Sequence, residues 1–365
     1  MKKSAAENPF IPFTPAEVQG LLSWYMGARR DLPWRETSDP YRIWLSEIML
    51  QQTRVEAVKG YYARFLAALP TIADLASAPE EQLLKLWEGL GYYSRARNLQ
   101  KAAQQIVREH GGAFPADYEA IRALPGIGSY TAGAIASIAF GIPAPAVDGN
   151  VLRVLARYAA TEREITDPAV KSAAEELLRP LIPEGAAGDF NQSLIELGAT
   201  VCAPNAAPAC ERCPLRDNCR AAKTDDPTAY PKKKAKAARR IVPLTVLLLT
   251  DEGGEVLRYL IRRRPNKGLL AGLFEFPNLP GTLSPEEALT AAESFGFAPE
   301  SVQPLPPATH IFTHVEWHMT LFELHGRWER LLPDSGLLAV TGAELGKIYA
   351  VPSAFSAIMK IIENR

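Results

Sequence analysis

The sequence predicts a mainly helical N-terminal part joined to a smaller α+β domain. Between residue 15 and about residue 222, apolar residues recur at i, i+3 and i+4, the spacing of amphipathic helices. Residues 224–240 are polar, proline-marked and basic, as in an exposed interdomain linker. From Ile241 onward the pattern is that of β-strands. We therefore divide the chain into residues 1–223, a linker at 224–240 and a second domain at 241–365.

The composition excludes several classes of protein. Of 365 residues, 47% are hydrophobic, which is enough to form the cores of two domains or three. Lys and Arg number 40 against 41 Asp and Glu, so any anion-binding site must be local. The N-terminus lacks the apolar region of a signal peptide, and no run approaches the roughly 18 apolar residues of a membrane span. We expect a soluble, cytoplasmic protein without a membrane partner.

Individual elements follow from the periodicity and from Pro, Gly and Asp punctuation. Helices are expected at residues 15–30, 41–53, 80–93, 117–124, 129–140, 149–160 and 168–182. In the second domain, strands are expected at residues 241–250, 255–264 and twice within 309–326, with helices at 284–296 and near the C-terminus.

A glycine-rich turn, 124-LPGIGSYTAGAI-135, lies between two predicted helices. Gly126 and Gly128 permit positive φ and a close approach of the backbone to a ligand. The free N–H groups of the helix that follows could bind an anion such as a DNA phosphate. An ordinary turn between helices explains the same pattern, which alone does not separate the two interpretations.

The cysteines form one cluster. Cys202, Cys210, Cys213 and Cys219 are the only cysteines in the sequence and follow the spacing C-x7-C-x2-C-x5-C. Four thiolates in one short loop can enclose Zn²⁺ or a [4Fe–4S] cluster, and the spacing alone does not separate these from each other. Four protein ligands leave no open position, which favours a structural site over a catalytic one. The alternative is a group of free structural cysteines.

Two carboxylates are candidates for acid–base chemistry. Glu47 lies in an apolar helix, where burial would raise its pKa and keep it protonated near neutrality, as a general acid requires. Asp148 precedes the predicted helix 149–160, whose N–H groups would hold it ionised. Such a pair can cleave a glycosidic C–N bond. An outward-facing Glu and a simple N-cap Asp are the alternatives.

Together the hairpin, 147-VDGN-150 and the cysteine loop resemble the endonuclease III-like helix–hairpin–helix DNA glycosylases. More narrowly, several segments resemble the MutY branch of that family, the adenine DNA glycosylases: 32-LPWR-35, 43-IWLSEIMLQQTRV-55, 87-WEGLGYYSRARNL-99, 190-FNQSLIELGA-199, 268-GLLAGLFEFP-277 and 310-HIFTH-314. The resemblance runs from about residue 15 to the C-terminus.

The resemblance implies a six-helix barrel module with the helix–hairpin–helix, a module holding one [4Fe–4S] cluster on the four cysteines, and a MutT-like (Nudix-like) C-terminal domain. It implies a monomer that acts on double-stranded DNA carrying adenine opposite 8-oxoguanine or guanine. The enzyme would flip the adenine out of the stack and hydrolyse its N-glycosidic bond, a step of base excision repair.

The resemblance also implies roles for the residues of the reaction centre. Glu47 would protonate adenine N7, and Asp148 would stabilise or covalently capture the cation at C1′. Asn150 would lie beside this pair. Tyr130 stands where bifunctional relatives carry the lyase lysine, which implies base excision without strand cleavage. Its hydroxyl is expected close to Asp148.

Other matched residues would bind the substrate. The adenine pocket would be lined by Arg30, Leu32 and Trp34, with Gln192 at the base edge. Gln52 and Tyr92 would wedge into the duplex near 8-oxoguanine. A loop formed by Phe312, Thr313 and His314 would recognise that base. Gly126 and Gly128 would bind the DNA phosphate.

Three departures from the family pattern affect these expectations. The first cysteine gap is x7 where x6 is usual, and Thr313 replaces a serine. The C-terminal domain lacks the carboxylate-rich Nudix box, so it is expected to recognise a base and not to hydrolyse a nucleotide. Rival functions are a bifunctional glycosylase/lyase, a non-enzymatic DNA-binding or redox-sensing protein, and a nucleotide pyrophosphatase.

Overall fold

The computed structural model describes residues 8–204, 206–234, 238–328 and 336–365. The chain forms two compact units. Unit 1 comprises Met1–Ser77 and Asn98–Ala235, and unit 2 comprises Ala78–Arg97 and Lys236–Arg365. The helical segment 78–97 therefore groups with the C-terminal domain, which the sequence did not predict.

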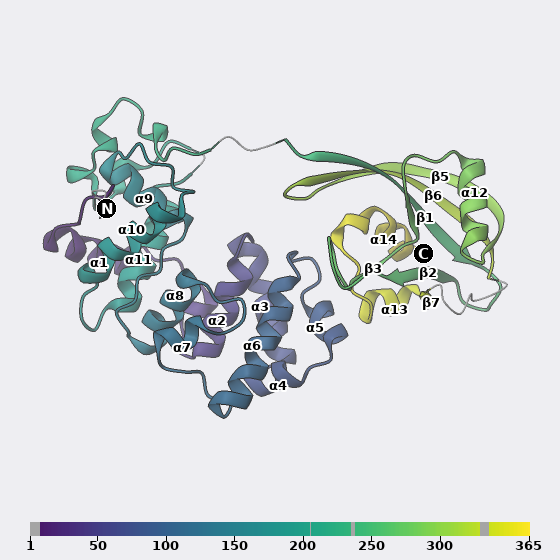
Figure 1. The fold of residues 1–365 in the computed structure, drawn as a ribbon, viewed down its shortest axis with the longest axis horizontal. Coiled ribbons are helices and arrows are strands. Elements are labelled where there is room, and N and C mark those ends of the chain that lie inside the picture. Colours follow the sequence, from purple (N-terminus) through teal and green to yellow (C-terminus); the bar gives the residue numbers. More distant parts are fainter. Residues whose placement is uncertain (1–7, 205, 235–237, 329–335) are drawn as a thin grey trace, which may run out of the picture. The chain divides into compact units, whose positions relative to one another are not determined.

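The helices of unit 1 are those of the N-terminal region (Figure 1). They begin at side-chain caps that the sequence supplies: Thr14 and Glu17 form a capping box, and Asp39, Asp117 and Asp167 cap later helices. The helices are α1 (Pro15–Ala28), α2 (Pro40–Leu50), α3 (Val55–Ala68), α4 (Ile72–Ser77), α6 (Ser94–His110, which starts in unit 2), α7 (Tyr118–Arg122), α8 (Ser129–Phe140), α9 (Gly149–Ala159), α10 (Pro168–Leu178) and α11 (Ala187–Thr200).

Several predicted helices end earlier than their apolar pattern suggests, and two of these ends lead into loops with positive φ values. The segment predicted at 41–53 ends at Leu50, and Gln52 has a φ of 58°. The segment predicted at 80–93 ends at Leu86 as α5 (Glu80–Leu86), because Gly89 and Gly91 take positive φ values. Each early end is followed by a loop that carries an exposed side chain, Gln52 in the first and Tyr92 in the second.

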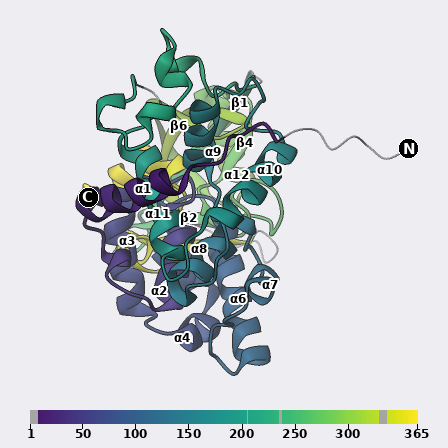
Figure 2. The ribbon, with the colours of Figure 1, turned by 90° about the vertical axis from the view of Figure 1, so that its left-hand side faces the viewer.

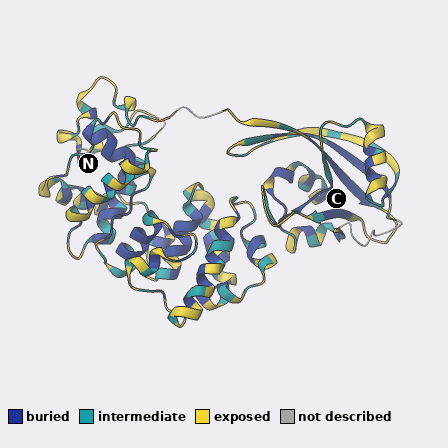
Figure 3. Ribbon diagram, in the orientation of Figure 1, coloured by how far each residue is buried: buried dark blue, intermediate teal, exposed yellow. Residues whose placement is uncertain are grey.

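One hydrophobic core of unit 1 lies between α1, α9, α10 and α11, whose inward faces are buried (Figure 3). Helices α2 and α8 pack side by side, as Figure 2 shows. Helix α8 has small residues because the chain passes close to it: a Cβ on Gly133 would lie 2.1 Å from the Pro145 carbonyl oxygen. The segment carrying Pro145 leads directly into the cap of α9.

Asn191 holds the same segment through hydrogen bonds to its backbone. Its side chain is fully buried on α11. Its Oδ1 accepts a hydrogen bond from the Ala146 N–H at 2.9 Å, and its Nδ2 donates to the Ala144 carbonyl at 2.8 Å. Because buried amides are costly without partners, this pairing sets where residue 148 emerges.

The described residues of the C-terminal domain form a seven-stranded mixed sheet of order β3-β2-β1-β6-β5, with β4 beside β1 and β7 beside β2. Among the strands described, only β1 and β6 pair in parallel. The strands are β1 (Arg240–Asp251), β2 (Arg258–Arg263), β3 (Phe274–Glu275), β4 (Asn278–Pro280), β5 (Ala298–Ile311), β6 (Val315–Arg327) and β7 (Leu337–Thr341).

Helices cover both faces of this sheet. At the centre of β1, Val246 and Leu248 point to a core shared with α14 (Ser356–Glu363). Leu247 and Leu249 point the other way, to a core shared with α12 (Pro285–Ser294). A short helix, α13 (Gly342–Lys347), follows β7.

Strand β5 is longer than predicted. It starts at Ala298 and includes several prolines, which the sequence pattern did not assign to a strand. Its place at the sheet edge explains this, because an edge strand does not need every N–H for pairing. The β5–β6 hairpin holds residues 312–314 at its tip, where the sequence predicted a recognition loop.

Within the described ranges, no helix has the length and apolarity needed to cross a membrane.

We predict that Gly133→Ala lowers the midpoint of thermal unfolding, because the added methyl overlaps the Pro145 carbonyl. Overpacking of this kind costs about 1–3 kcal/mol. The matched control is Gly20→Ala in α1, where a Cβ meets nothing within 4 Å. A Gly133→Ala midpoint equal to or above that of the control would contradict the proposed packing.

Candidate active site

A pocket of about 560 Å³ opens in unit 1 between α2, α8, α11 and the start of α9. It brings together residues that the sequence predicted from distant segments: Arg30, Leu32, Trp34, Glu47, Gln52, Tyr130, Asp148, Asn150 and Gln192. Tyr92 and residues 312–314 lie in unit 2.

Glu47 occupies the predicted inward position on α2. Glu47 is 9% exposed, and its apolar neighbours on the same helix are buried. Burial raises the pKa of its carboxyl to about 7, the hydrogen bond from Tyr130 opposes this rise, and the nearby Asp148 adds to it. Glu47 is therefore protonated in a substantial fraction of molecules near neutral pH, as a general acid requires.

Asp148 caps α9, as the sequence predicted. Its Oδ1 accepts the backbone N–H groups of Asn150 and Val151, each at 2.8 Å, and its Oδ2 accepts the Asn150 side-chain amide at 2.7 Å. The sequence anticipated only this stabilisation of the anion. In the structure, burial outweighs it and raises the pKa of Asp148 above its ordinary value. Three donors still serve the Asp148 carboxylate, so it is better solvated as an anion than Glu47.

Tyr130 lies close enough to both carboxyls for their charges to act on it, but its hydrogen bond differs from the expectation. The sequence placed its hydroxyl close to Asp148 as a support for that carboxylate. The hydroxyl instead donates to Glu47 Oε2 at 2.8 Å. Burial, together with the charges of Glu47 and Asp148, raises the pKa of Tyr130 well above its ordinary value, so the phenol keeps its proton. Tyr130 therefore orients the acid.

Arg153 supports the Asp148 site and was missed by sequence reasoning. It lies one helical turn after Asn150, and its Nη2 donates to Asn150 Oδ1 and to the Gly198 carbonyl, both at 2.8 Å. Its Nε donates to the Cys202 carbonyl at 2.8 Å. Asn150 is thus held by Arg153 while it donates to Asp148, and the i, i+3 spacing was the only sequence signal of this.

Glu196 is a second residue that the sequence did not single out. It is fully buried on α11 and accepts two side-chain bonds from Arg30, at 2.7 and 2.8 Å, and one from Arg35 at 2.7 Å. These arginines hold its pKa at about 2 although burial opposes them. Arg30 lines the pocket as predicted, but its guanidinium is already engaged by Glu196. In the sequence, Glu196 stands between the apolar residues Ile195 and Leu197, and this was the available signal.

The glycine hairpin has the predicted form, with different demands on its two glycines. Gly126 has a φ of 78°, and a Cβ there would lie 2.7 Å from the Asn98 Cβ. Gly128 has a φ of −94°, which other residues adopt, so positive φ does not explain it. It is exposed, a Cβ there would meet nothing, and α8 begins without a side-chain cap. The first N–H groups of α8 are therefore open to an anion.

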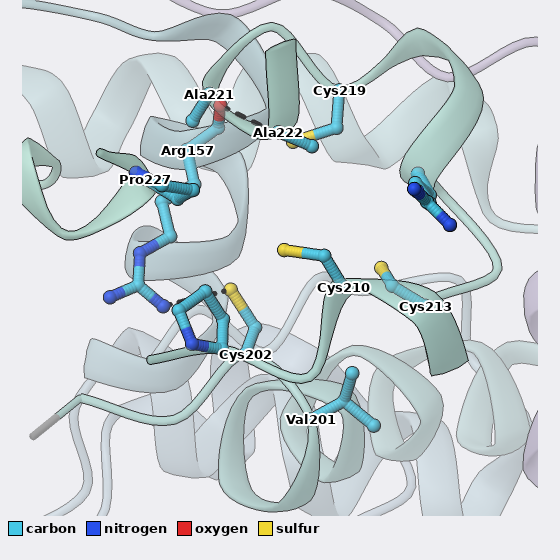
Figure 4. Close-up of a pocket in the computed structure, with 11 residues that line it drawn as sticks. Arg157, Val201, Cys202, Cys210, Cys213, Cys219, Ala221, Ala222 and Pro227 are labelled. Atoms are coloured by element: carbon cyan, nitrogen blue, oxygen red, sulfur yellow. Dashed lines mark hydrogen bonds between the residues drawn. The ribbon is translucent and has the colours of Figure 1, made fainter. Parts of the chain in front are cut away.

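The four cysteines line one small cavity of about 30 Å³, with their side chains around the hollow (Figure 4). Arg157 of α9 donates from Nη1 to the Cys202 Sγ at 3.2 Å, and the Cys219 thiol donates to the Arg157 carbonyl at 3.6 Å. Among the described residues, no three His, Cys, Asp or Glu side chains are grouped closely enough to hold a single metal ion.

In unit 2 the structure brings together two segments predicted to meet 8-oxoguanine. The Tyr92 hydroxyl lies 2.8 Å from the Thr313 Oγ1. Tyr92 is 47% exposed and has a φ of 46°, as Gln52 has 58° in unit 1. Left-handed backbone at non-glycine residues often marks functional sites, and both residues were predicted as wedges.

The chain matches two family descriptions. Residues 45–180 match the HhH-GPD superfamily of base excision DNA repair proteins, and residues 245–361 match the NUDIX domain. An adenine DNA glycosylase of Rattus norvegicus is 38% identical over 363 residues, which cover 84% of this chain and 70% of the relative. The chain belongs to the adenine DNA glycosylase family.

Two further comparisons agree with this family. The Homo sapiens adenine DNA glycosylase is 38% identical over 341 residues, and this chain spans 62% of that relative's length. A solved endonuclease III trapped covalently on DNA shares 26% identity and a TM-score of 0.50, covering 58% of this chain and 98% of the other. The predicted glycosylase class, the helix–hairpin–helix region and the Nudix domain are therefore confirmed.

We predict a bell-shaped pH dependence of base excision in this glycosylase. With Glu47 as the general acid and Asp148 as the anion, the rate should fall as pH rises through about 7, where Glu47 loses its proton, and should also fall at low pH, where Asp148 becomes protonated. Tyr130→Phe removes a bond that lowers the pKa of Glu47, so the alkaline limb should move to higher pH. Single-turnover rates measured across the pH range define both limbs. An alkaline limb that stays in place, or moves to lower pH, would contradict the role of Tyr130.

Proposed function

We propose that this chain removes adenine paired with 8-oxoguanine or guanine from duplex DNA by hydrolysis, without cutting the strand. One observation carries the proposal: a carboxyl with a pKa of about 7, Glu47, shares a pocket with Asp148, a carboxyl that three donors stabilise as an anion. The names of the relatives support adenine as the base, and the pocket is large enough to receive a flipped base.

The reaction follows from this arrangement. Flipping brings the adenine into the pocket. Glu47, oriented by Tyr130, protonates the base at N7, and the electrons of the C1′–N9 bond leave with it. Asp148 then stabilises the cation at C1′ or captures it as an ester. Water then supplies the hydroxyl at C1′, freeing Asp148, and its other proton restores the Glu47 carboxyl, which yields free adenine and an abasic site.

Strand cleavage of the lyase type needs an amine that attacks C1′ and forms a Schiff base. Position 130 carries a phenol, and no lysine lines the pocket within the described part of the chain. This supports a monofunctional enzyme.

We propose that the backbone at Gly126 and Gly128 binds a DNA phosphate, which accounts for DNA binding by a chain of net charge −1. The 8-oxoguanine would be read by Tyr92 and by Phe312, Thr313 and His314. The Phe312 ring packs edge-on against His310 and Trp317, with ring centroids 4.6 and 4.9 Å away, which holds the loop in one shape. The missing Nudix box supports recognition in place of nucleotide hydrolysis.

We also propose that Cys202, Cys210, Cys213 and Cys219 hold one [4Fe–4S] cluster. The four thiols surround one cavity, and their spread does not suit a single ion. A zinc ion would need all four sulfurs about 2.3 Å from one point. In this role the cluster stabilises the loop that receives the Arg153 bond at Cys202.

The decisive test of the function compares Glu47→Gln and Asp148→Asn with wild type in single-turnover adenine release. Each variant should keep its affinity for an A:8-oxoguanine duplex and lose about 10²–10⁴-fold in rate, the usual contribution of a positioned acid or base. Glu56→Gln, at an exposed site on α3, is the control. The product should contain strand breaks only after alkali. Near-wild-type rates, or stoichiometric breaks without alkali, would sink the proposal.

For the metal centre, we expect about four irons per chain and visible absorption near 400 nm in anaerobically purified protein, both lost in Cys213→Ser. Glu211→Gln, in the same loop, should retain them. Stoichiometric zinc in wild type would contradict the iron–sulfur assignment.

A further inference from the structure

The segment 80–97, here called the elbow, comprises α5, the loop 87–93 and the first turn of α6. Its base is bound to the C-terminal domain through Lys85, whose Nζ donates to the carbonyls of Leu345 at 2.9 Å and Tyr349 at 3.1 Å. Glu88 pairs with Lys85 at 2.5 Å and accepts the Val351 N–H at 2.7 Å. Lys85 and Glu88 therefore connect the elbow to the backbone of α13 and of the segment that follows it.

A second set of contacts involves Arg97 and the strand β2. Arg97 pairs with Glu80 at 2.7 Å and donates to the Ala271 carbonyl at 2.8 Å. Arg263 lies 3.7 Å from Glu80 and 3.6 Å from Glu81. The Lys85 side chain is 17% exposed, whereas those of Arg263 and Glu81 are 40% and 51% exposed. Exposed ion pairs contribute little, so Lys85 is a stronger attachment than Arg263.

Hydrogen bonds and ring contacts connect the residues of the elbow loop between this base and Tyr92. The Trp87 indole donates to the Gly91 carbonyl at 3.1 Å, and the Arg95 guanidinium donates to the carbonyls of Leu90 and Gly91. The same guanidinium lies over the rings of Trp87 and Tyr92. A displacement at the base would therefore move Tyr92 as well.

The loop 312–314 is supported on two sides. On one side, the Arg239 Nε donates to the Phe312 carbonyl at 3.0 Å, and the Arg240 N–H donates to the His314 carbonyl at 3.1 Å. On the other side, the Thr313 hydroxyl meets the Tyr92 hydroxyl at 2.8 Å. The elbow, through Tyr92, and the loop 312–314, through Thr313, thus contribute neighbouring side chains to one surface.

We propose that the elbow acts together with the C-terminal domain in recognising 8-oxoguanine. In this proposal Lys85 is a positioning residue that affects the preference for 8-oxoguanine over guanine. Lys85 holds the elbow on the C-terminal domain, and so keeps Tyr92 against Thr313 before DNA binds. This inference rests on the proposed function, because it concerns the base opposite the adenine. It predicts that preference depends on a residue that lies outside the adenine pocket.

The test measures single-turnover adenine release from A:8-oxoguanine and A:G duplexes for wild type, Lys85→Ala, Lys85→Arg and Lys101→Ala. In Lys85→Ala the ratio of the two rates should fall about tenfold, through the A:8-oxoguanine rate, since small misplacements cost this much or more. Lys85→Arg should restore most of the ratio. Lys101→Ala, at an exposed site on α6, should match wild type.

A double-mutant cycle separates positioning from general stability. If Lys85 acts through Tyr92, then Lys85→Ala should add little to the loss in ratio already caused by Tyr92→Phe. Hydrogen exchange at the Val351 amide should also be faster in Lys85→Ala, because its partner Glu88 is released. An unchanged ratio, an equal fall in both rates, or fully additive losses would overturn the inference. A wild-type ratio near one would instead remove the proposed function itself.

Discussion

The main constraint on the structure of unit 1 is that two carboxyl groups share one largely buried pocket. Burial raises the pKa of both carboxyls, and the charge of Asp148 raises the pKa of Glu47 further. The protein resolves this by unequal support: Asp148 receives three hydrogen-bond donors, while Glu47 receives the single Tyr130 hydroxyl. The proton therefore resides on Glu47, and one fold supplies an acid and an anion at the same pH.

The packing around the pocket maintains this arrangement. Gly133 lets the chain before Asp148 pass close to α8, and Asn191 satisfies the backbone of that segment. Arg153 connects the Asn150 amide to the first residue of the cysteine loop. The cysteine loop and the Asp148 carboxylate are thus joined through one helix, α9, so a defect in the loop would affect Asp148 without direct contact.

Sequence reasoning located the features that local pattern determines. Glu47 was predictable because an acid within an apolar helix must either face outward or titrate abnormally, and Asp148 because it precedes a helix. Arg153 and Glu196 were missed because their importance comes from partners 45 and 166 residues away. Strand β5 was missed in part because its prolines are tolerated only at a sheet edge. The grouping of residues 78–97 with the C-terminal domain follows from tertiary contacts that no local pattern records.

The division of roles between the carboxyls requires that Glu47 carry a proton near neutral pH before any DNA is bound. Infrared difference titration of the free protein, comparing wild type with Glu47→Gln, measures this protonation directly. We expect one protonated carboxyl band that titrates near pH 7 in wild type and is absent from the variant. A wild-type protein whose carboxyl groups have all lost their protons by about pH 5, where ordinary Glu and Asp are ionised, would contradict this assignment.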